Sequence, residues 1–323
     1  MMSKPKTSIR MSLLLRVGSN QAIERCYHKK TLTFSCAANW LDYALKHNDQ
    51  ATGDFFECAF AHVPKDDPRI AEIRAADGKP MGNNLLILEN KKDNSCILRY
   101  VPAILMPAVS FYSFHPIDIL KRNQSLSIEN SEKQPYITFS LDKYRSSMGY
   151  KPENASYLLI NNVREFIDEL KERIPIAVDE NKENLTSKRF FIKYNPKETI
   201  LCKDVNYKAY NRNEVFFCPN NNLNEMFWKL PEYEWQSEVR MVIPHMNFVQ
   251  SYDFISYDYQ INTLDVFLPK FQTYASIFPA KKVHTIFFDQ FNETELSYNY
   301  CLLEMTCDDI QQKLHSNAPV ELY

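Results

Sequence analysis

Glycine is scarce in this chain, with only five in 323 residues. They form neither G-x-G-x-x-G nor G-x-x-x-x-G-K-[ST]. Backbone amides cradle a phosphate where clustered glycines allow the chain to approach it closely. The scarcity therefore excludes a P-loop nucleotidase and a Rossmann dehydrogenase. Any nucleotide that binds is expected to be held by side chains.

Paired cysteines are also missing, because none of the eight cysteines belongs to a C-x-x-C motif. Two ligands of a structural zinc site usually come from one tight turn, so a zinc ribbon is excluded. Cys26 with His28, and Cys58 with His62, have the spacing of a metal-ligand pair. The favoured interpretation is nevertheless ordinary reduced thiols, with no metal bound.

Long apolar runs and a large net charge are absent as well. The apolar run near the N-terminus, Met11 to Leu15, is too short for a signal-peptide core or for the roughly 20 residues of a membrane span. The formal net charge of −2 gives no global attraction to nucleic acid or anionic membrane. The expectation is a cytoplasmic protein with no membrane partner.

Many segments have the β-branched, aromatic or alternating composition that is typical of strands. Their expected ranges are 12–17, 31–35, 84–89, 96–101, 108–114, 188–197, 214–218, 238–243 and 282–289. Short helices are expected between them. Their expected ranges are 21–28 (capped by Asn20), 39–47, 68–77 (opened by Asp67 and Pro68, ended by Gly78) and 308–314.

A longer helix is predicted to begin near Asn162 by a stripe at i, i+3, i+4, i+7 and i+11. The stripe consists of Val163, Phe166, Ile167, Leu170 and Ile174. The expected solvent-facing residues are Glu165, Asp168, Glu169, Lys171 and Glu172. Strands with interspersed helices favour an α+β fold over a doubly wound sheet. We expect one domain over 1–323, with an insertion at about 116–200, where the chain is more polar.

A row of polar residues on one predicted strand is the best candidate for chemistry. In a strand, Gln236, Glu238 and Arg240 share one face, and Val239 and Met241 share the other. One interpretation is a solvated strand face, or Glu238 and Arg240 as a cross-strand charge pair. The other is a polar row facing a cleft. The aromatic, acidic segment that precedes it favours the cleft, because exposed aromatic rings are costly unless they recognise something.

Two further residues lie at the ends of predicted strands. Arg16 is the only charge in SLLLRV, and an arginine there can clamp a phosphate or a ribose-linked carboxamide. Ser35 ends TLTFS. A strand-end arginine, a strand-end serine and a late-strand glutamate, Glu238, therefore follow one another in the chain.

That order resembles the Arg–Ser–Glu arrangement of ADP-ribosyltransferases. More narrowly, the chain is similar to a widespread family of uncharacterised bacterial proteins related to that fold. The matching segments are LLLRV (13–17), TLTFS (31–35), GDFFE (53–57), WQSEVR (235–240) and VHTIFF (283–288). The similarity covers roughly 1–60 and 205–290. Gln236 stands where many members have Glu, which favours acceptors other than arginine.

The resemblance implies an ADP-ribosyltransferase-like split β-sheet core and NAD as a substrate, with no metal. Breaking the N-glycosidic bond of NAD builds positive charge on the ribose, which one carboxylate can stabilise. Glu238 would have this role, and Arg16 and Ser35 would hold NAD. Tyr43 or Phe55 would stack on the nicotinamide. The residues expected to meet the acceptor are Gln236, Trp235 and Tyr233.

The acceptor is expected to be a macromolecule, either nucleic acid or protein. Segment 188–197 interleaves cations with rings, and Arg189, Lys193 and Tyr194 would form a platform for single-stranded RNA. The alternative for this segment is an amphipathic edge strand with solvated lysines. By resemblance, the setting is a toxin–antitoxin or phage-defence system, with an antitoxin as neutralising partner.

Two other function classes stay open. A non-catalytic binding module of the same fold needs only the aromatic segment 229–235 as a partner site. A nuclease or phosphotransferase is the least favoured class, because no H-x-H or H-x-x-x-H pair occurs.

Overall fold

The chain was analysed as a computed structural model. The structure describes residues 13–47, 56–75, 85–90, 93–114, 136–139, 152–187, 199–206, 215–217, 224–231, 238–244, 246–248, 263–280, 284–292 and 297–304.

The chain divides into two compact units, and both are discontinuous in sequence. Unit 1 consists of residues 1–31, 112–168 and 269–323. Unit 2 consists of residues 32–111 and 169–268. Three elements continue from one unit into the other along the chain: strand β2 (Thr31–Phe34), strand β6 (Ala108–Phe114) and helix α7 (Val163–Glu180).

Unit 1 is built around strand β1 (Leu13–Ser19). It pairs antiparallel with the last residues of β6 on one side and with β8 (Ala155–Ile160) on the other. β8 also pairs antiparallel with β15 (Ala275–Pro279). Every residue of β8 is buried, so this strand reads as a continuous apolar run rather than an alternation.

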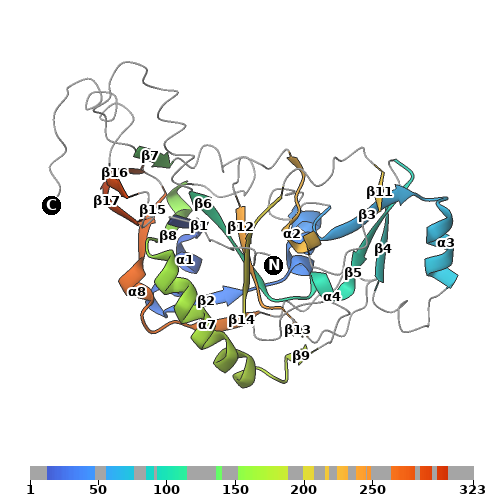
Figure 1. The fold of residues 1–323 in the computed structure, drawn as a ribbon, viewed down its shortest axis with the longest axis horizontal. Coiled ribbons are helices and arrows are strands. Elements are labelled where there is room, and N and C mark those ends of the chain that lie inside the picture. The colour runs from blue at the N-terminus through green and yellow to red at the C-terminus, as the bar shows by residue number, and fades with distance from the viewer. Residues whose placement is uncertain are drawn as a thin grey trace, which may run out of the picture. The chain divides into compact units, whose positions relative to one another are not determined.

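Helix α1 (Asn20–His28) lies against β1, β8 and β15 in unit 1 (Figure 1). Its N-cap is Ser19, whose hydroxyl accepts a hydrogen bond from the amide of Ala22 at 3.2 Å. The predicted cap, Asn20, is therefore wrong by one residue. The Asn20 side chain instead accepts a hydrogen bond from the Ser156 hydroxyl at 2.7 Å, which ties the helix to β8.

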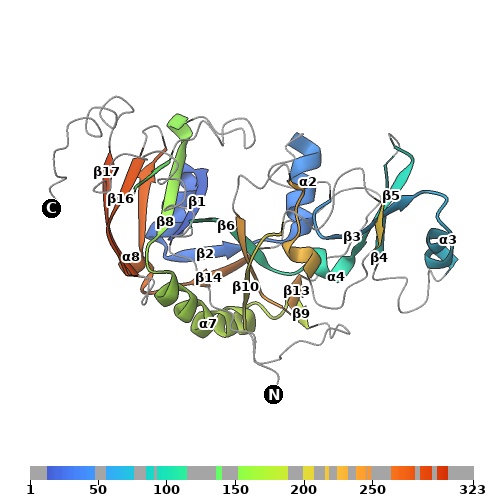
Figure 2. The same cartoon turned by 45° about the horizontal axis from the view of Figure 1, so that its top comes forward.

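The remaining elements of unit 1 follow each other in the last part of the chain or precede β8. Helix α8 (Phe271–Tyr274) leads into β15. A three-stranded antiparallel sheet has the order β17-β16-β7, and β16 and β17 run side by side in Figure 2. Its strands and the short 3-10 turn before β8 are β7 (Tyr136–Phe139), β16 (His284–Asn292), β17 (Ser297–Glu304) and η2 (Pro152–Asn154).

Helix α7 confirms the predicted apolar stripe, because all five of its members are buried. The helix continues beyond the predicted stripe to Glu180, and Ala177 is buried as well. One of the predicted solvent-facing residues is wrong: Glu169 is buried, with 5% of its side chain exposed. Glu169 follows buried Phe166 by three residues and precedes buried Leu170, so it lies on the same side of the helix as the apolar stripe.

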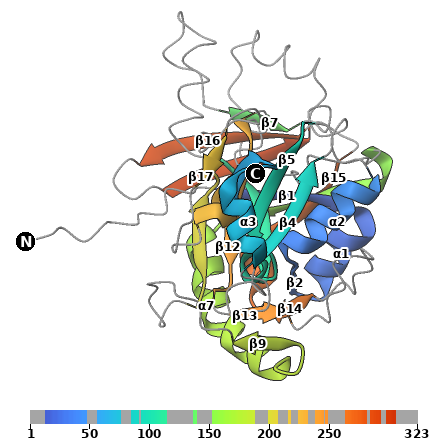
Figure 3. The same ribbon diagram turned by 90° about the vertical axis from the view of Figure 1, so that its right-hand side faces the viewer.

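In unit 2, a four-stranded antiparallel sheet has the order β11-β3-β5-β4, and β4 and β5 lie side by side in Figure 3. Helix α3 (Pro68–Ala75) packs on it through Ile70 (Figure 1). The helix begins at Pro68, as predicted. The strands are β3 (Ala59–Pro64), β4 (Leu85–Asn90), β5 (Ser95–Tyr100) and β11 (Phe216–Phe217).

A second group of strands in unit 2 positions the candidate site. β12 (Glu238–Val242) lies between β10 (Leu201–Asp204), its antiparallel partner, and the first part of β6. The other pairs are β14-β2 and β13-β9. The remaining elements are β2 (Thr31–Phe34), α2 (Ala37–His47), α4 (Val101–Ile104), β9 (Leu185–Ser187), η3 (Asn224–Phe227), β13 (Met246–Phe248) and β14 (Leu264–Phe267).

The α+β prediction is confirmed, because the strands pair mostly antiparallel and the helices between them are mostly short. The insertion at 116–200 stays a prediction. Within that segment the structure describes β7, η2, β8, α7 and β9, and β8 pairs with both β1 and β15. Among the helices that the structure describes, none is long and apolar enough to cross a bilayer.

Candidate functional site

Strand β12 carries the predicted polar row, and the alternation of its side chains places that row as expected. Glu238 and Arg240 point to one face, and Val239 and Met241 are completely buried on the other. The polar face is not solvated, however: 6% of Glu238 and 1% of Arg240 is exposed. For Glu238 and Arg240, the interpretation of a solvated strand face is therefore wrong. The two side chains do form an ion pair, at 2.6 Å, but within one strand and not across two strands as predicted.

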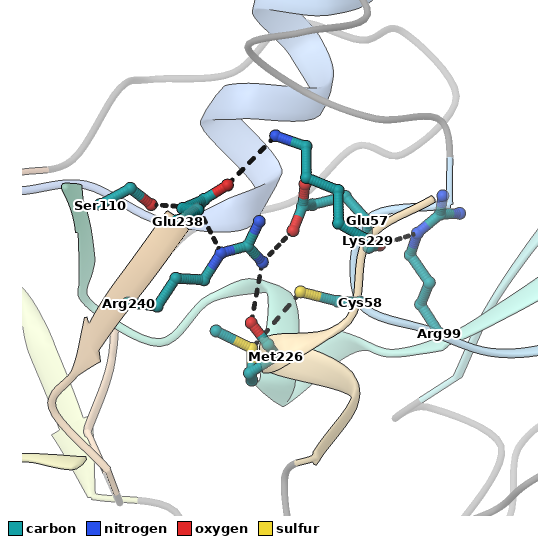
Figure 4. Close-up of polar contacts among 8 residues, drawn as sticks. All are labelled: Glu57, Cys58, Arg99, Ser110, Met226, Lys229, Glu238 and Arg240. Atoms are coloured by element: carbon teal, nitrogen blue, oxygen red, sulfur yellow. Dashed lines mark hydrogen bonds and ion pairs between the residues drawn. The ribbon is translucent and has the colours of Figure 1, made fainter. Parts of the chain in front are cut away.

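Glu238 is held by three side chains from three different places in the chain (Figure 4). The Ser110 hydroxyl of β6 donates to Oε1 at 2.6 Å. Arg240 Nε donates to the same oxygen at 2.6 Å. Lys229 Nζ donates to Oε2 at 3.2 Å. The carboxylate is thus fixed at both oxygens by charged or hydroxyl donors, which are the strong class of hydrogen-bond donors.

Arg240 joins Glu238 to a second acid. Its Nη1 donates to Glu57 Oε1 and to the backbone carbonyl of Met226, the latter at 2.8 Å. Its guanidinium also lies over the Trp40 ring of α2, with Cζ at 5.4 Å from the ring centroid. Arg240 therefore lies between two carboxylates and beside an aromatic ring, and all these partners belong to unit 2.

A tight turn over Phe56–Cys58 places the Glu57 carboxylate next to Arg240. Cys58 has a φ of 57°, a left-handed conformation that costs a non-glycine residue free energy. Arg99 Nε of β5 donates to the Glu57 carbonyl at 2.7 Å, and the Cys58 thiol donates to Met226 Sδ at 3.4 Å. These contacts hold the turn against η3.

Apolar packing fixes the same turn from the other side. Phe56 packs in a buried cluster with Ala59, Ile97, Val205 and Leu230. Burial of each large apolar side chain contributes about 1.5–3 kcal/mol, enough to offset the left-handed backbone at Cys58. The turn and the segment after η3 are thereby anchored to one core.

The buried charges of this cluster balance, with Glu57 and Glu238 opposite Lys229 and Arg240. Burial alone would raise the pKa of Glu238, but Arg240 and Lys229 hold that pKa far below its ordinary value. Burial raises the pKa of Glu57 despite Arg240 and Lys229, and the charge of Glu238 adds to the rise. Glu238 is therefore the firmly ionised carboxylate of the pair.

Ser35 lies next to the same strand that contacts Glu238. It exchanges backbone hydrogen bonds with Ala108 of β6, at 2.9 and 2.7 Å, and Ser110 follows two residues later on β6. The Ser35 hydroxyl accepts a hydrogen bond from Asn39 Nδ2 at 2.9 Å. Ser35 and Glu238 thus flank β6 within unit 2.

The structure describes two further predicted residues, Arg16 and Tyr43. Arg16 is half-buried in β1 of unit 1, where it pairs in register with Leu158 of β8. Tyr43 belongs to α2 of unit 2, and 40% of its side chain is exposed. The remaining predicted site residues lie outside the described residues: Phe55, Arg189, Lys193, Tyr194, Tyr233, Trp235 and Gln236.

Sequence reasoning missed three members of the cluster: Glu57, Ser110 and Lys229. Glu57 closes the GDFFE segment and carried a signal, because it was part of a recognised motif without a role. Ser110 stands in an apolar strand, where a single hydroxyl is unremarkable in sequence. Lys229 precedes Leu230 in a segment interpreted as an exposed loop, yet only 2% of its side chain is exposed.

Comparisons of the chain with protein-family models, with curated proteins and with solved structures find no match. In the described part of the chain, no group of three His, Cys, Asp or Glu side chains is arranged to hold a metal ion. The cysteines described are all free thiols: Cys26, Cys36, Cys58, Cys96 and Cys202.

Proposed function

We propose that this protein is a mono-ADP-ribosyltransferase that uses Glu238 to cleave NAD and transfers ADP-ribose to a macromolecular acceptor. The observation that supports the proposal most is the state of Glu238, an ionised carboxylate buried beside Ser110 and fixed by Arg240. A carboxylate with a fixed position and a fixed charge costs no reorganisation when positive charge develops next to it.

Apart from this carboxylate, the reaction needs residues that bind and orient NAD. The bond between nicotinamide and the ribose breaks, and its electron pair leaves with nicotinamide, which departs as a neutral molecule. The ribose carbon becomes positively charged, and the acceptor's nucleophile bonds to that carbon and gives up its proton to solvent. Glu238 stabilises the charge, and Ser35, which flanks the same strand β6, orients the ribose side of NAD. Arg16 holds a phosphate, and Tyr43 or Phe55 stacks on the nicotinamide.

Glu238→Gln tests the catalytic role, because it removes the charge and keeps the shape. We expect nicotinamide release to fall by a factor on the order of 10²–10³, as for loss of one preorganised electrostatic group. The matched control is Glu225→Gln, which neutralises another buried acid of unit 2 that makes no ion pair with Arg240 or Lys229. The control is expected to turn over NAD at the parent rate.

The measurement is nicotinamide release from NAD, with circular dichroism of each variant to show that it is folded. Turnover by Glu238→Gln at the parent rate would remove Glu238 from the mechanism. A parent protein that releases no nicotinamide, with or without cell extract as acceptor source, would reject the proposed activity as a whole.

The acceptor is identified in the same reaction if the NAD carries its label in the adenosine part. We propose nucleic acid as the acceptor, held by Arg189, Lys193 and Tyr194, and by Gln236, Trp235 and Tyr233 near the scissile bond. Treatment of the labelled extract with ribonuclease, deoxyribonuclease or protease assigns the label. Label that only protease releases would make a protein the acceptor.

A non-catalytic binding module is the second candidate, and one observation favours it. Glu238 is 6% exposed, both of its oxygens already accept hydrogen bonds, and the cluster around it has no net charge. Such a network also serves to fix a unique packing. This candidate predicts NAD-independent partner binding that survives Glu238→Gln wherever that variant folds.

A further inference from the structure

We propose that Glu57 is a positioning residue for Glu238, acting through Arg240. The inference rests on the proposed function, because it assigns Glu57 a task in the same cleavage of NAD. Glu57 touches neither Glu238 nor Ser35 directly in the contacts described, and reaches the site through one guanidinium.

The geometry of Arg240 is the first argument. Its Nε donates to Glu238 Oε1 at 2.6 Å, and its Nη1 donates to Glu57 Oε1. A planar guanidinium cannot rotate toward one carboxylate without leaving the other. Glu57 therefore fixes the angle at which Arg240 meets Glu238, and with it the position of Oε1.

The backbone around Glu57 is the second argument. A left-handed residue, Cys58, and a buried arginine, Arg99, together hold the Glu57 backbone. Strained backbone of this kind persists where the surrounding structure over-determines it, and it gathers at functional sites. The strained backbone at Cys58 is therefore consistent with a turn that holds the Glu57 carboxylate in one position.

The sharing of charge is the third argument. A single acid paired with both Arg240 and Lys229 would have its negative charge cancelled, which would weaken its attraction for a developing cation. Glu57 also forms an ion pair with Arg240 and so partly neutralises the positive charge of that guanidinium. Glu238 consequently keeps more negative potential than its two cationic neighbours alone would leave it.

The buried carboxylate of Glu57 also gives the site a pH response. Within the described residues, Glu57 Oε2 has no hydrogen-bond partner, and burial raises the pKa of the group. The charged groups that act on it are Arg240, Lys229 and Glu238; Arg99 donates to its carbonyl, and Cys58 follows it in the chain. Protonation of Glu57 breaks its ion pair with Arg240, which then no longer holds Arg240 in position. Activity should therefore decline as pH falls through the raised pKa of Glu57, although Glu238 stays ionised.

The test compares Glu57→Gln, Glu57→Asp and the control Glu225→Gln in nicotinamide release. We expect kcat of Glu57→Gln to fall on the order of 10²-fold with KM for NAD unchanged, as for a small misplacement of a catalytic group. Glu57→Asp keeps the charge and should recover part of that loss. The acid limb of the pH profile should flatten in Glu57→Gln and stay in Glu225→Gln.

A second measurement does not depend on activity. The Nε–H signal of Arg240 in protein labelled with ¹⁵N-arginine, assigned with Arg240→Lys, should shift in Glu57→Gln and stay in place in Glu225→Gln. If Glu57→Gln does not fold, Glu57→Asp carries both measurements, with a smaller loss in kcat and a smaller shift.

The outcomes separate the two claims. A parent protein that cleaves NAD, with Glu57 variants at the parent kcat, overturns the positioning role and leaves the proposed function intact. An equal loss in Glu57→Gln and Glu57→Asp, with a pH profile unchanged from the parent, also overturns it, since a merely structural role predicts that pattern. A parent that does not cleave NAD overturns the proposed function and this role together, whatever the Arg240 signal shows.

Discussion

At the residue scale, the buried acids of unit 2 differ in what compensates their charge. Glu238 has two cations and a hydroxyl, and Glu57 shares one of those cations. Glu225, which is 1% exposed, has no ion pair among the described residues. Burial raises its pKa to about 7, and its own amide and the charge of Lys203 only partly oppose the rise.

Glu225 should therefore make the stability of the fold depend on pH. A carboxyl whose pKa is higher in the folded than in the unfolded state stabilises the fold at low pH, and that contribution is lost as pH rises. The window runs from the ordinary value of 4.5 to about 7. At about 1.4 kcal/mol per pH unit, the loss is at most about 3 kcal/mol.

Glu225→Gln should abolish this dependence, because the amide does not ionise. Urea unfolding of parent and variant at pH 4.5 and pH 8 measures it. We expect the difference in unfolding free energy between variant and parent to change by up to about 3 kcal/mol in favour of the variant at pH 8. A difference that is the same at both pH values would show that Glu225 has an ordinary pKa.

The sequence predicted the polar face of β12 because strand alternation is a local rule. It did not predict what that face meets. Glu57 and Ser110 are 181 and 128 residues away from Glu238 in the chain, and no periodicity connects such distances. Pairing of buried charges depends on tertiary packing, and neither composition nor residue spacing predicts which distant residues meet.

At the element scale, the end of α1 carries a conformation that its sequence does not favour. Lys29 is the C-cap with φ −80°, and the next residue, Lys30, has φ 52°. Helices commonly end on a left-handed residue, which is usually glycine because it has no Cβ. The scarcity of glycine in this chain leaves a lysine in that position.

Lys30→Gly is accordingly expected to stabilise the protein. Relief of the left-handed strain outweighs the greater freedom that glycine has in the unfolded chain, with a net gain of about 0.5–1 kcal/mol. Thermal unfolding measures the change. Lys29→Gly is the matched control, because its φ is ordinary and glycine there should only destabilise. A lower melting temperature for Lys30→Gly than for the parent would contradict the argument.

Elements with a clear period were predicted well, and elements without one were missed. The stripe of α7 and the range of β6 match the structure. β8, with the sequence ASYLLI, was not predicted, because a strand buried on both faces shows no alternation. β15 was missed for a related reason: its burial varies without a period of two.

At the scale of the whole molecule, unit 1 depends on the last part of the chain. Phe271 and Tyr274 are completely buried, and Tyr274 accepts a hydrogen bond from the Asn161 amide at 2.9 Å. The ring of Tyr274 also packs on Phe166, with centroids 5.7 Å apart. Phe271, Tyr274 and strand β15 all lie C-terminal to residue 268.

Truncation after residue 268 should therefore unfold unit 1 and not simply shorten the protein. Loss of a buried aromatic side chain costs about 3–5 kcal/mol. Phe271, Tyr274 and Phe278 are lost together with strands β15, β16 and β17. We expect poor dispersion in an amide NMR spectrum and rapid proteolysis within 112–168. A chain ending at residue 304, which keeps every strand of unit 1 that the structure describes, is the control. Equal protease resistance of both chains would contradict this dependence.

The alternation of the two units along the chain has a consequence for how a gene of this kind can change. The polypeptide passes between the units four times, near residues 31, 111, 168 and 268. A recombination event with a single breakpoint between residues 32 and 268 must exchange parts of both units at once. Neither unit can therefore be gained, lost or duplicated as one continuous segment of the gene.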